Sequence, residues 1–177
     1  MNPLREYEIA FVGLKEGIHY FDYKIDRSFF SLFENAPDID CKLDIKLKFD
    51  KKNTFFILDF QISGFVNMPC NRCATPLDYP VDADNVVVVK MGKSGDENRE
   101  SDEDVIYIGH SETHFNVAQL IYEFAILSIP VNRVYCSNLP GRECNLEALK
   151  ILEELKEKKD NTEEDPRWSS LKNIKFK

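Results

Sequence analysis

Apolar and polar residues alternate most regularly between residues 41 and 62. The apolar positions are Cys41, Leu43, Ile45, Leu47 and Phe49, followed after a turn at residues 51–53 by Phe56, Leu58, Phe60 and Ile62. A period of two residues is typical of a strand that buries one face. The pattern therefore predicts an antiparallel hairpin with one buried face, and it places Cys41 in the core.

Shorter runs predict strands on both sides of this hairpin. Residues 7–25 contain two aromatic and β-branched runs around a turn at Lys15 to Gly17, which predicts a first hairpin. Residues 77–91 and 105–109 are also strand-like, and residues 27–37 predict a short helix that ends at its proline. We expect an antiparallel sheet of about six strands, which is near the common size.

The period changes to that of a helix after residue 116. One face of the predicted helix at residues 117–128 carries Val117, Leu120, Ile121, Phe124 and Ser128. Asn116 is a natural N-cap, and Gln119 stands where it would complete a capping box. Because most of its remaining surface is also apolar, we expect this helix to be buried. Asn145 is placed to cap a second, charged helix.

These elements predict an α+β fold: an antiparallel β-rich domain with a buried helix and a charged C-terminal helix, followed by a basic tail. The chain has 177 residues, of which 43% are hydrophobic, so it can bury the core of one domain. We expect that domain at residues 1–159, with a CxxC turn at 70–73 and an acidic loop at 93–104. An acidic linker and a basic amphipathic tail should follow at residues 160–177.

The N-terminus lacks a basic region followed by an apolar core, and no stretch approaches the roughly 20 apolar residues needed to cross a bilayer. We therefore expect a cytoplasmic protein without a membrane partner. Its formal net charge of −8 disfavours a simple nucleic-acid coat, because such binding needs clustered cations. The charge is uneven, however, because the last twelve residues carry four cations and no acid.

The tail has the features of a short segment that orders on a surface. Asp165 can cap a short helix that starts at Pro166, and Trp168, Leu171 and Ile174 fall on one stripe. The residues predicted to bind nucleic acid or a protein partner are Arg167, Trp168, Leu171, Lys172 and Lys175. Docking of the tail on its own domain is the alternative.

Four of the five cysteines form two separated pairs. Cys70 and Cys73 are two residues apart, and Cys136 and Cys144 are separated by seven. A reducing cytosol argues against disulfides, and four thiolates from two turns are what a tetrahedral zinc site uses. We predict these four residues as metal ligands and zinc as the cofactor, although the second spacing exceeds the usual two to four residues. The alternative is that the cysteines pack without a metal as small apolar groups.

Cys70 and Cys73 could instead form a redox pair. A thioredoxin-type pair needs its first cysteine at the N-terminus of a helix, where the thiolate is stabilised. Here the pair joins two predicted strands, which disfavours a thiol redox enzyme. No Ser–His–Asp order, phosphate-binding glycine loop or paired-carboxylate site stands out, so we predict a non-enzyme without a small-molecule substrate.

Several of these features together resemble one protein family. They are the "CNRC" turn at mid-chain, a helix ending "ILSIPVNRVYC", a later cysteine, an acidic linker and a terminal "DPRWSSLKNIKF". In this order they resemble the YceD family, the bacterial large ribosomal RNA subunit accumulation proteins. The resemblance implies a role in accumulation of large-subunit ribosomal RNA and in ribosome assembly, with suspected metal and nucleic-acid binding and no established catalytic chemistry.

The functional expectation is therefore a non-catalytic factor that binds pre-ribosomal RNA or a large-subunit ribosomal protein. Two alternatives from other classes stay open. One is a thiol redox protein that uses Cys70 and Cys73. The other is an adaptor that binds a protein through its acidic surface.

Overall fold

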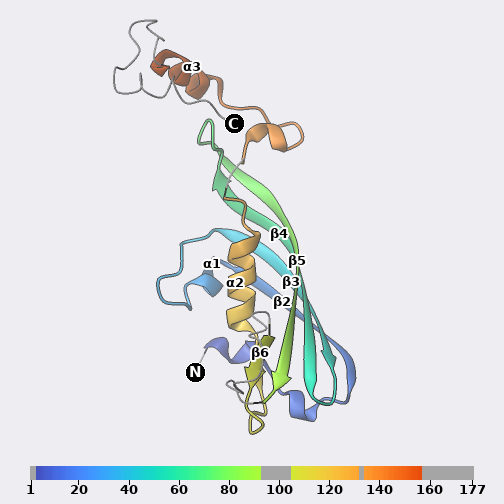
Figure 1. Cartoon of the computed structure of the whole chain (residues 1–177). Helices are drawn as coiled ribbons and strands as arrows, with labels where there is room; N and C mark the ends of the chain where they lie inside the picture. Colours follow the sequence, from blue (N-terminus) through green and yellow to red (C-terminus); the bar gives the residue numbers. More distant parts are fainter. Residues whose placement is uncertain (1–2, 93–104, 132–133, 157–177) are drawn as a thin grey trace, which may run out of the picture. The chain divides into compact units, whose positions relative to one another are not determined.

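The computed structural model describes residues 3–92, 105–131 and 134–156, and it confirms the predicted α+β class. The chain divides into two compact units, Met1–Cys144 and Asn145–Lys177. In the first unit, a five-stranded sheet has the order β2 (Gly17–Asp26), β3 (Cys41–Lys51), β4 (Phe55–Pro69), β5 (Pro76–Met91) and β6 (Val105–Ile108). The helices are α1 (Arg27–Phe30), α2 (Ala118–Ser128) and, in the second unit, α3 (Leu146–Leu155) (Figure 1).

The long hairpin predicted from alternation is confirmed. Strands β2 to β5 follow one another in the chain and pair antiparallel, with Leu47 opposite Phe60 in the register of β3 and β4. Strand β6 differs from the expected pattern, because it runs parallel to the end of β5. Parallel neighbours need a connection of about a dozen residues or more, and residues 92–104 separate these two strands.

The predicted first hairpin is wrong. Strand β1 (Glu8–Ile9) does not pair with β2 but with β7 (Phe115–Asn116), in an antiparallel sheet of two strands. The chain between β1 and β2 turns through a 3₁₀ helix at Phe11–Gly13. This path buries Tyr7, Ile9 and Phe11 in the core.

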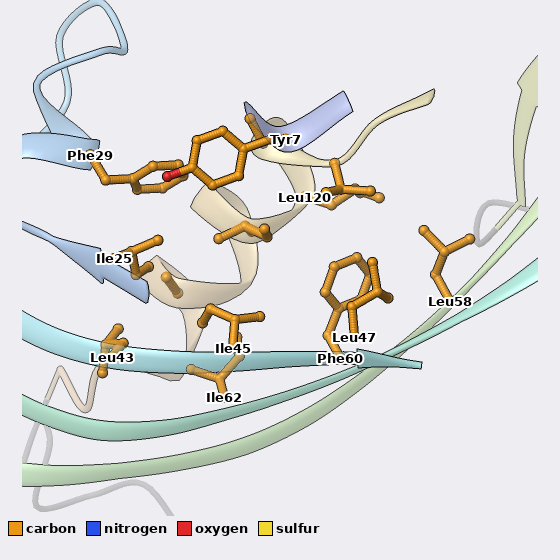
Figure 2. Packing of buried hydrophobic residues seen from close by; sticks show 14 of the residues in the cluster. Tyr7, Ile25, Phe29, Leu43, Ile45, Leu47, Leu58, Phe60, Ile62 and Leu120 are labelled. Atoms are coloured by element: carbon orange, nitrogen blue, oxygen red, sulfur yellow. The ribbon is translucent and has the colours of Figure 1, made fainter. Parts of the chain in front are cut away.

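The core lies between the sheet and α2. Figure 2 shows apolar side chains of β3 and β4 directed toward the helix, with Tyr7 and Phe29 closing the opposite side of the cluster. Phe60 is fully buried and its ring meets that of Phe124 on α2 with centroids 5.3 Å apart. Cys41 is buried in this core as predicted, and burial, followed by the charges of nearby aspartates, raises the pKa of its thiol to about 11.

Helix α2 begins one residue later than predicted. The Asn116 side chain accepts a hydrogen bond from the Ala118 N–H at 2.9 Å and donates to the carbonyl of Leu4 at 2.8 Å. The capping box is not formed, because the Gln119 amide donates to Glu123 instead, at 2.7 Å. The N-terminal segment, through the carbonyl of Leu4, thus contacts Asn116 at the helix start, where the capping box was predicted.

In the second unit, α3 starts at the predicted cap. The Asn145 side chain accepts hydrogen bonds from the N–H groups of Glu147 and Ala148. None of the described helices is long and apolar enough to cross a membrane. The predicted domain boundary after residue 159 and the whole predicted tail lie outside the described residues, and both stay predictions.

Candidate metal centre

The structure brings the two cysteine pairs together. The sulfurs of Cys70, Cys73, Cys136 and Cys144 all lie within 4.8 Å of one another, and the Sγ atoms of Cys73 and Cys136 are 3.5 Å apart. A tetrahedral zinc with Zn–S bonds of about 2.3 Å sets its sulfurs about 3.8 Å apart. The size of the cluster therefore fits one tetrahedral metal ion.

The first pair is held by a closed turn between β4 and β5. Register pairing of these strands ends where Pro69 faces Pro76, and the loop between them carries both cysteines. The Cys70 N–H donates to the Thr75 carbonyl, and the Ala74 N–H donates to the Cys70 carbonyl, each at 2.9 Å. These two hydrogen bonds close the turn at residues 70–75 and fix the backbone positions from which the two cysteine side chains project.

The second pair tolerates its long spacing because the loop between the cysteines coils. Cys136 opens a 3₁₀ helix, Cys136–Asn138, and the Leu139 N–H donates to the Cys136 carbonyl at 3.0 Å. Gly141 then turns the chain with a φ of 69°, a conformation that favours glycine. The extra residues are taken up locally, so Cys144 returns to the cluster.

Asn71 links the two loops, and its role was missed in the sequence. Its N–H donates to the Val134 carbonyl at 2.7 Å, and its side-chain oxygen accepts from the Val134 N–H at 2.9 Å. This pair of hydrogen bonds fastens the first cysteine turn to the segment that leads into Cys136. An asparagine inside a CxxC turn is a weak signal, because asparagine is common in turns for local reasons.

The pKa values of the clustered thiols are shifted in different directions. Burial opposes ionisation of Cys70, but the N–H groups of Cys73, Arg72 and Cys136 outweigh it and hold the pKa of Cys70 below its ordinary value. Burial, followed by contacts with the neighbouring thiols, raises the pKa of Cys136 to about 12, and the pKa of Cys144 is raised for the same reasons. A metal ion would reverse this, since coordinated thiols are deprotonated.

The ligand set is that of a structural site. In the described part of the chain, the cluster consists of sulfur donors alone. Four thiolates suit zinc, and a site closed by four protein ligands has no open position for a substrate or an activated water. What the arrangement can do chemically is hold two distant loops together.

The same geometry disfavours a dithiol redox site. Cys70 and Cys73 lie in the turn between two strands, and both are buried. Reactive redox thiols are accessible to their partners. The predicted partner-binding residues Arg167, Trp168, Leu171, Lys172 and Lys175 lie outside the described residues.

Comparison with known proteins gives one match. A family model described as "Large ribosomal RNA subunit accumulation protein YceD" matches residues 58–175, which is more than half of the chain. The matched region starts inside β4 and includes all four clustered cysteines. No curated protein and no solved structure matches the chain.

Proposed function

We infer that this chain, which belongs to the YceD family of large ribosomal RNA subunit accumulation proteins, promotes the accumulation of that RNA during ribosome assembly. It acts as a non-catalytic cytoplasmic factor, and its direct partner is pre-ribosomal RNA. The family match over residues 58–175 carries this proposal. The closed, all-sulfur cluster supports a binding role, because it offers no open position for chemistry.

The four cysteines hold one zinc ion in this proposal. The ion replaces a covalent link between the β4–β5 turn and the loop at residues 134–144, and it keeps a surface composed from both loops in one shape. Protein purified without chelator should contain about one zinc per chain by elemental analysis. Cys136→Ser should abolish zinc retention, whereas Cys41→Ala, which removes a buried cysteine outside the cluster, should leave it intact.

The C-terminal tail supplies a second contact with the partner. Arginine and lysine favour phosphate groups, and a tryptophan typically anchors an interface. We assign Arg167, Lys172 and Lys175 to phosphate, and Trp168 with Leu171 to the apolar part of the contact. This assignment is supported by the charge contrast between the tail and a chain of net charge −8.

Sedimentation through a sucrose gradient tests the proposed function. Tagged full-length protein should migrate with large-subunit precursors, and ribonuclease treatment should return it to the top of the gradient. Protein that stays at the top with and without ribonuclease would contradict the proposal. Co-migration that resists ribonuclease would point to a ribosomal protein as the direct partner, as the adaptor alternative requires.

A thiol redox function is the second candidate, because the pKa of Cys70 is lowered. It requires zinc-free protein that exchanges disulfides through Cys70 and Cys73. An insulin-reduction assay distinguishes the two functions. We expect no turnover from zinc-loaded protein, and Cys70→Ser should then change zinc content and leave reductase activity at background.

A further inference from the structure

The two cysteine loops also bring two arginines to one cavity. Arg72 lies inside the Cys70–Cys73 turn, and Arg142 lies in the loop between Cys136 and Cys144. A cavity of about 500 Å³ is lined by Arg72, Tyr135, Ser137, Arg142, Glu143 and Cys144. Its volume is within the range of small-ligand sites, which extends over about 300–1,000 Å³. Cys144 places this cavity directly against the metal centre.

Both guanidinium groups are available for a ligand. Arg72 and Arg142 are exposed, and neither forms an ion pair with any residue that the structure describes, although Glu143 lines the same cavity. Their backbones are fixed. The Arg72 N–H approaches the Cys70 sulfur at 3.5 Å, and the Arg142 N–H donates to the Leu139 carbonyl at 3.3 Å. Two cations are thus presented from well-defined positions.

The cavity combines the groups that bind a nucleotide. A guanidinium presents several donors in a planar fork that matches phosphate oxygens, and two of them here flank one space. Tyr135 adds a partly exposed aromatic ring, with 36% of its surface accessible, on which a base can stack. The Ser137 hydroxyl adds a donor and acceptor for a ribose or a base edge.

We propose that this cavity binds one nucleotide of single-stranded RNA, with its phosphate on Arg72 and Arg142 and its base on Tyr135. The proposal rests on the function proposed above and deepens it, because it names a contact in the described body of the protein. The metal centre then has a definite purpose: it sets the spacing of two arginines that come from loops far apart in the sequence. An acidic peptide is the competing ligand, and the stacking ring favours RNA over it.

Fluorescence anisotropy tests the proposal with zinc-loaded, full-length protein. The probe is a fluorescein-labelled, 12-nucleotide single-stranded RNA of mixed sequence, compared with a duplex of the same length. The double variant R72Q/R142Q should bind the single strand about tenfold more weakly or worse. It should also reduce the slope of log affinity against log salt by about 0.7, as expected for one lost phosphate contact on a single strand.

A matched control separates this site from general charge. The double variant K46Q/K48Q removes two exposed cations from the outer face of β3, and it should bind the RNA as the unchanged protein does. Tyr135→Ala should weaken binding about fivefold or more without changing the salt slope, and Tyr135→Phe should retain binding. Equal losses in the two double variants would overturn the proposal.

Three further results would also overturn it. One is a loss of zinc from R72Q/R142Q, which would show that the arginines serve the metal centre. The others are equal affinity for the duplex and equal competition by a polyglutamate peptide. If R72Q/R142Q binds the probe normally while the unchanged protein co-sediments with precursors, the cavity proposal fails and the proposed function stands. Failure of the unchanged protein to co-sediment contradicts the proposed function itself, whatever the probe shows.

Discussion

The hydrophobic core and the cysteine cluster of the first unit are built in opposite ways. The core distributes its contacts over many side chains from strands that are consecutive in the chain and from α2. The cluster depends on four sulfurs from two loops, and it offers no substitute for any of them. A core residue therefore contributes to the stability of the whole unit, whereas a cluster residue determines the local geometry of one end.

The largest expected effect comes from a cavity in the core. Phe60→Ala should lower the free energy of unfolding by about 3–5 kcal/mol, because the side chain is fully buried against Phe124. Urea denaturation measures the change. The control is Phe65→Ala on the same strand, where 55% of the side chain is exposed and the cost should stay within about 0.5 kcal/mol. Similar losses in both variants would break the comparison.

Alkaline pH should weaken the core through Cys41. The pKa of this thiol in the folded protein is about 11, above its ordinary value of 9.0, so the neutral form is favoured by folding. That contribution is fully present below pH 9 and is lost as pH rises toward 11, by about 2–3 kcal/mol. Urea midpoints of zinc-loaded protein at pH 8 and pH 11 measure the loss.

Cys41→Ala is the control for this pH dependence. The variant keeps the partly buried Tyr23, whose pKa burial raises to about 12. Its stability should therefore fall less between pH 8 and pH 11 than that of the unchanged protein. Identical pH profiles would show that Cys41 does not titrate with unfolding. Acid should act on the cysteine cluster and not on Cys41, because protonation of thiolates releases a metal from the cluster.

A smaller effect is expected at the link between the loops. Asn71→Ala removes the acceptor for the Val134 N–H and should weaken zinc affinity by about 10–100-fold, as is typical when a residue that orients metal ligands is lost. Competition with a chromophoric chelator measures the affinity. Asn67→Ala is the matched control, because Asn67 is exposed and its side chain donates to Asp78 away from the cluster. Equal weakening by both would refute the link.

The smallest effect on stability is expected from the tail. Deletion of residues 166–177 should change the free energy of unfolding by less than about 1 kcal/mol, because a surface segment contributes little to a core. Association with ribosomal precursors should nevertheless fall, and Trp168→Ala should reproduce most of that loss. Calorimetry and gradient sedimentation measure the two quantities. A deleted protein that unfolds outright would show that the tail belongs to the folded body.

The predictable part of the fold is the part with a strong local period. Strands β3 and β4 and helix α2 were predicted from alternation and from a helical face, and Asn145 was predicted as a cap from its residue type alone. Alternation tells which face of a strand is buried, but not which strand lies beside it. For that reason the pairing of the two-residue β1 with β7 and the parallel direction of β6 were missed.

The candidate site shows the same division. The two cysteine pairs are visible in the sequence, and the position of the CxxC turn between strands could be predicted. Together they predict all four cysteines as one ligand set. The spacing of the second pair was uninformative, because a 3₁₀ turn and Gly141 absorb the extra residues. The link from Asn71 to Val134 joins residues that are 63 positions apart in the sequence. No local sequence pattern covers such a separation, so the link was not predicted. The placement of Arg72 and Arg142 around one cavity likewise joins residues that are far apart in the sequence.

The long separation in sequence between the two cysteine pairs also affects the order of folding events. Strands β2 to β5 are neighbours in the chain, and short loops join β3 to β4 and β4 to β5. Synthesis runs from the N-terminus, and Cys70 and Cys73 leave the ribosome well before Cys136 and Cys144 exist. The four cysteines can therefore come together only after Cys144 has been synthesised, later than strands β2 to β5. With the zinc site proposed above, a shortage of zinc should leave the core formed and the two cysteine loops unlinked.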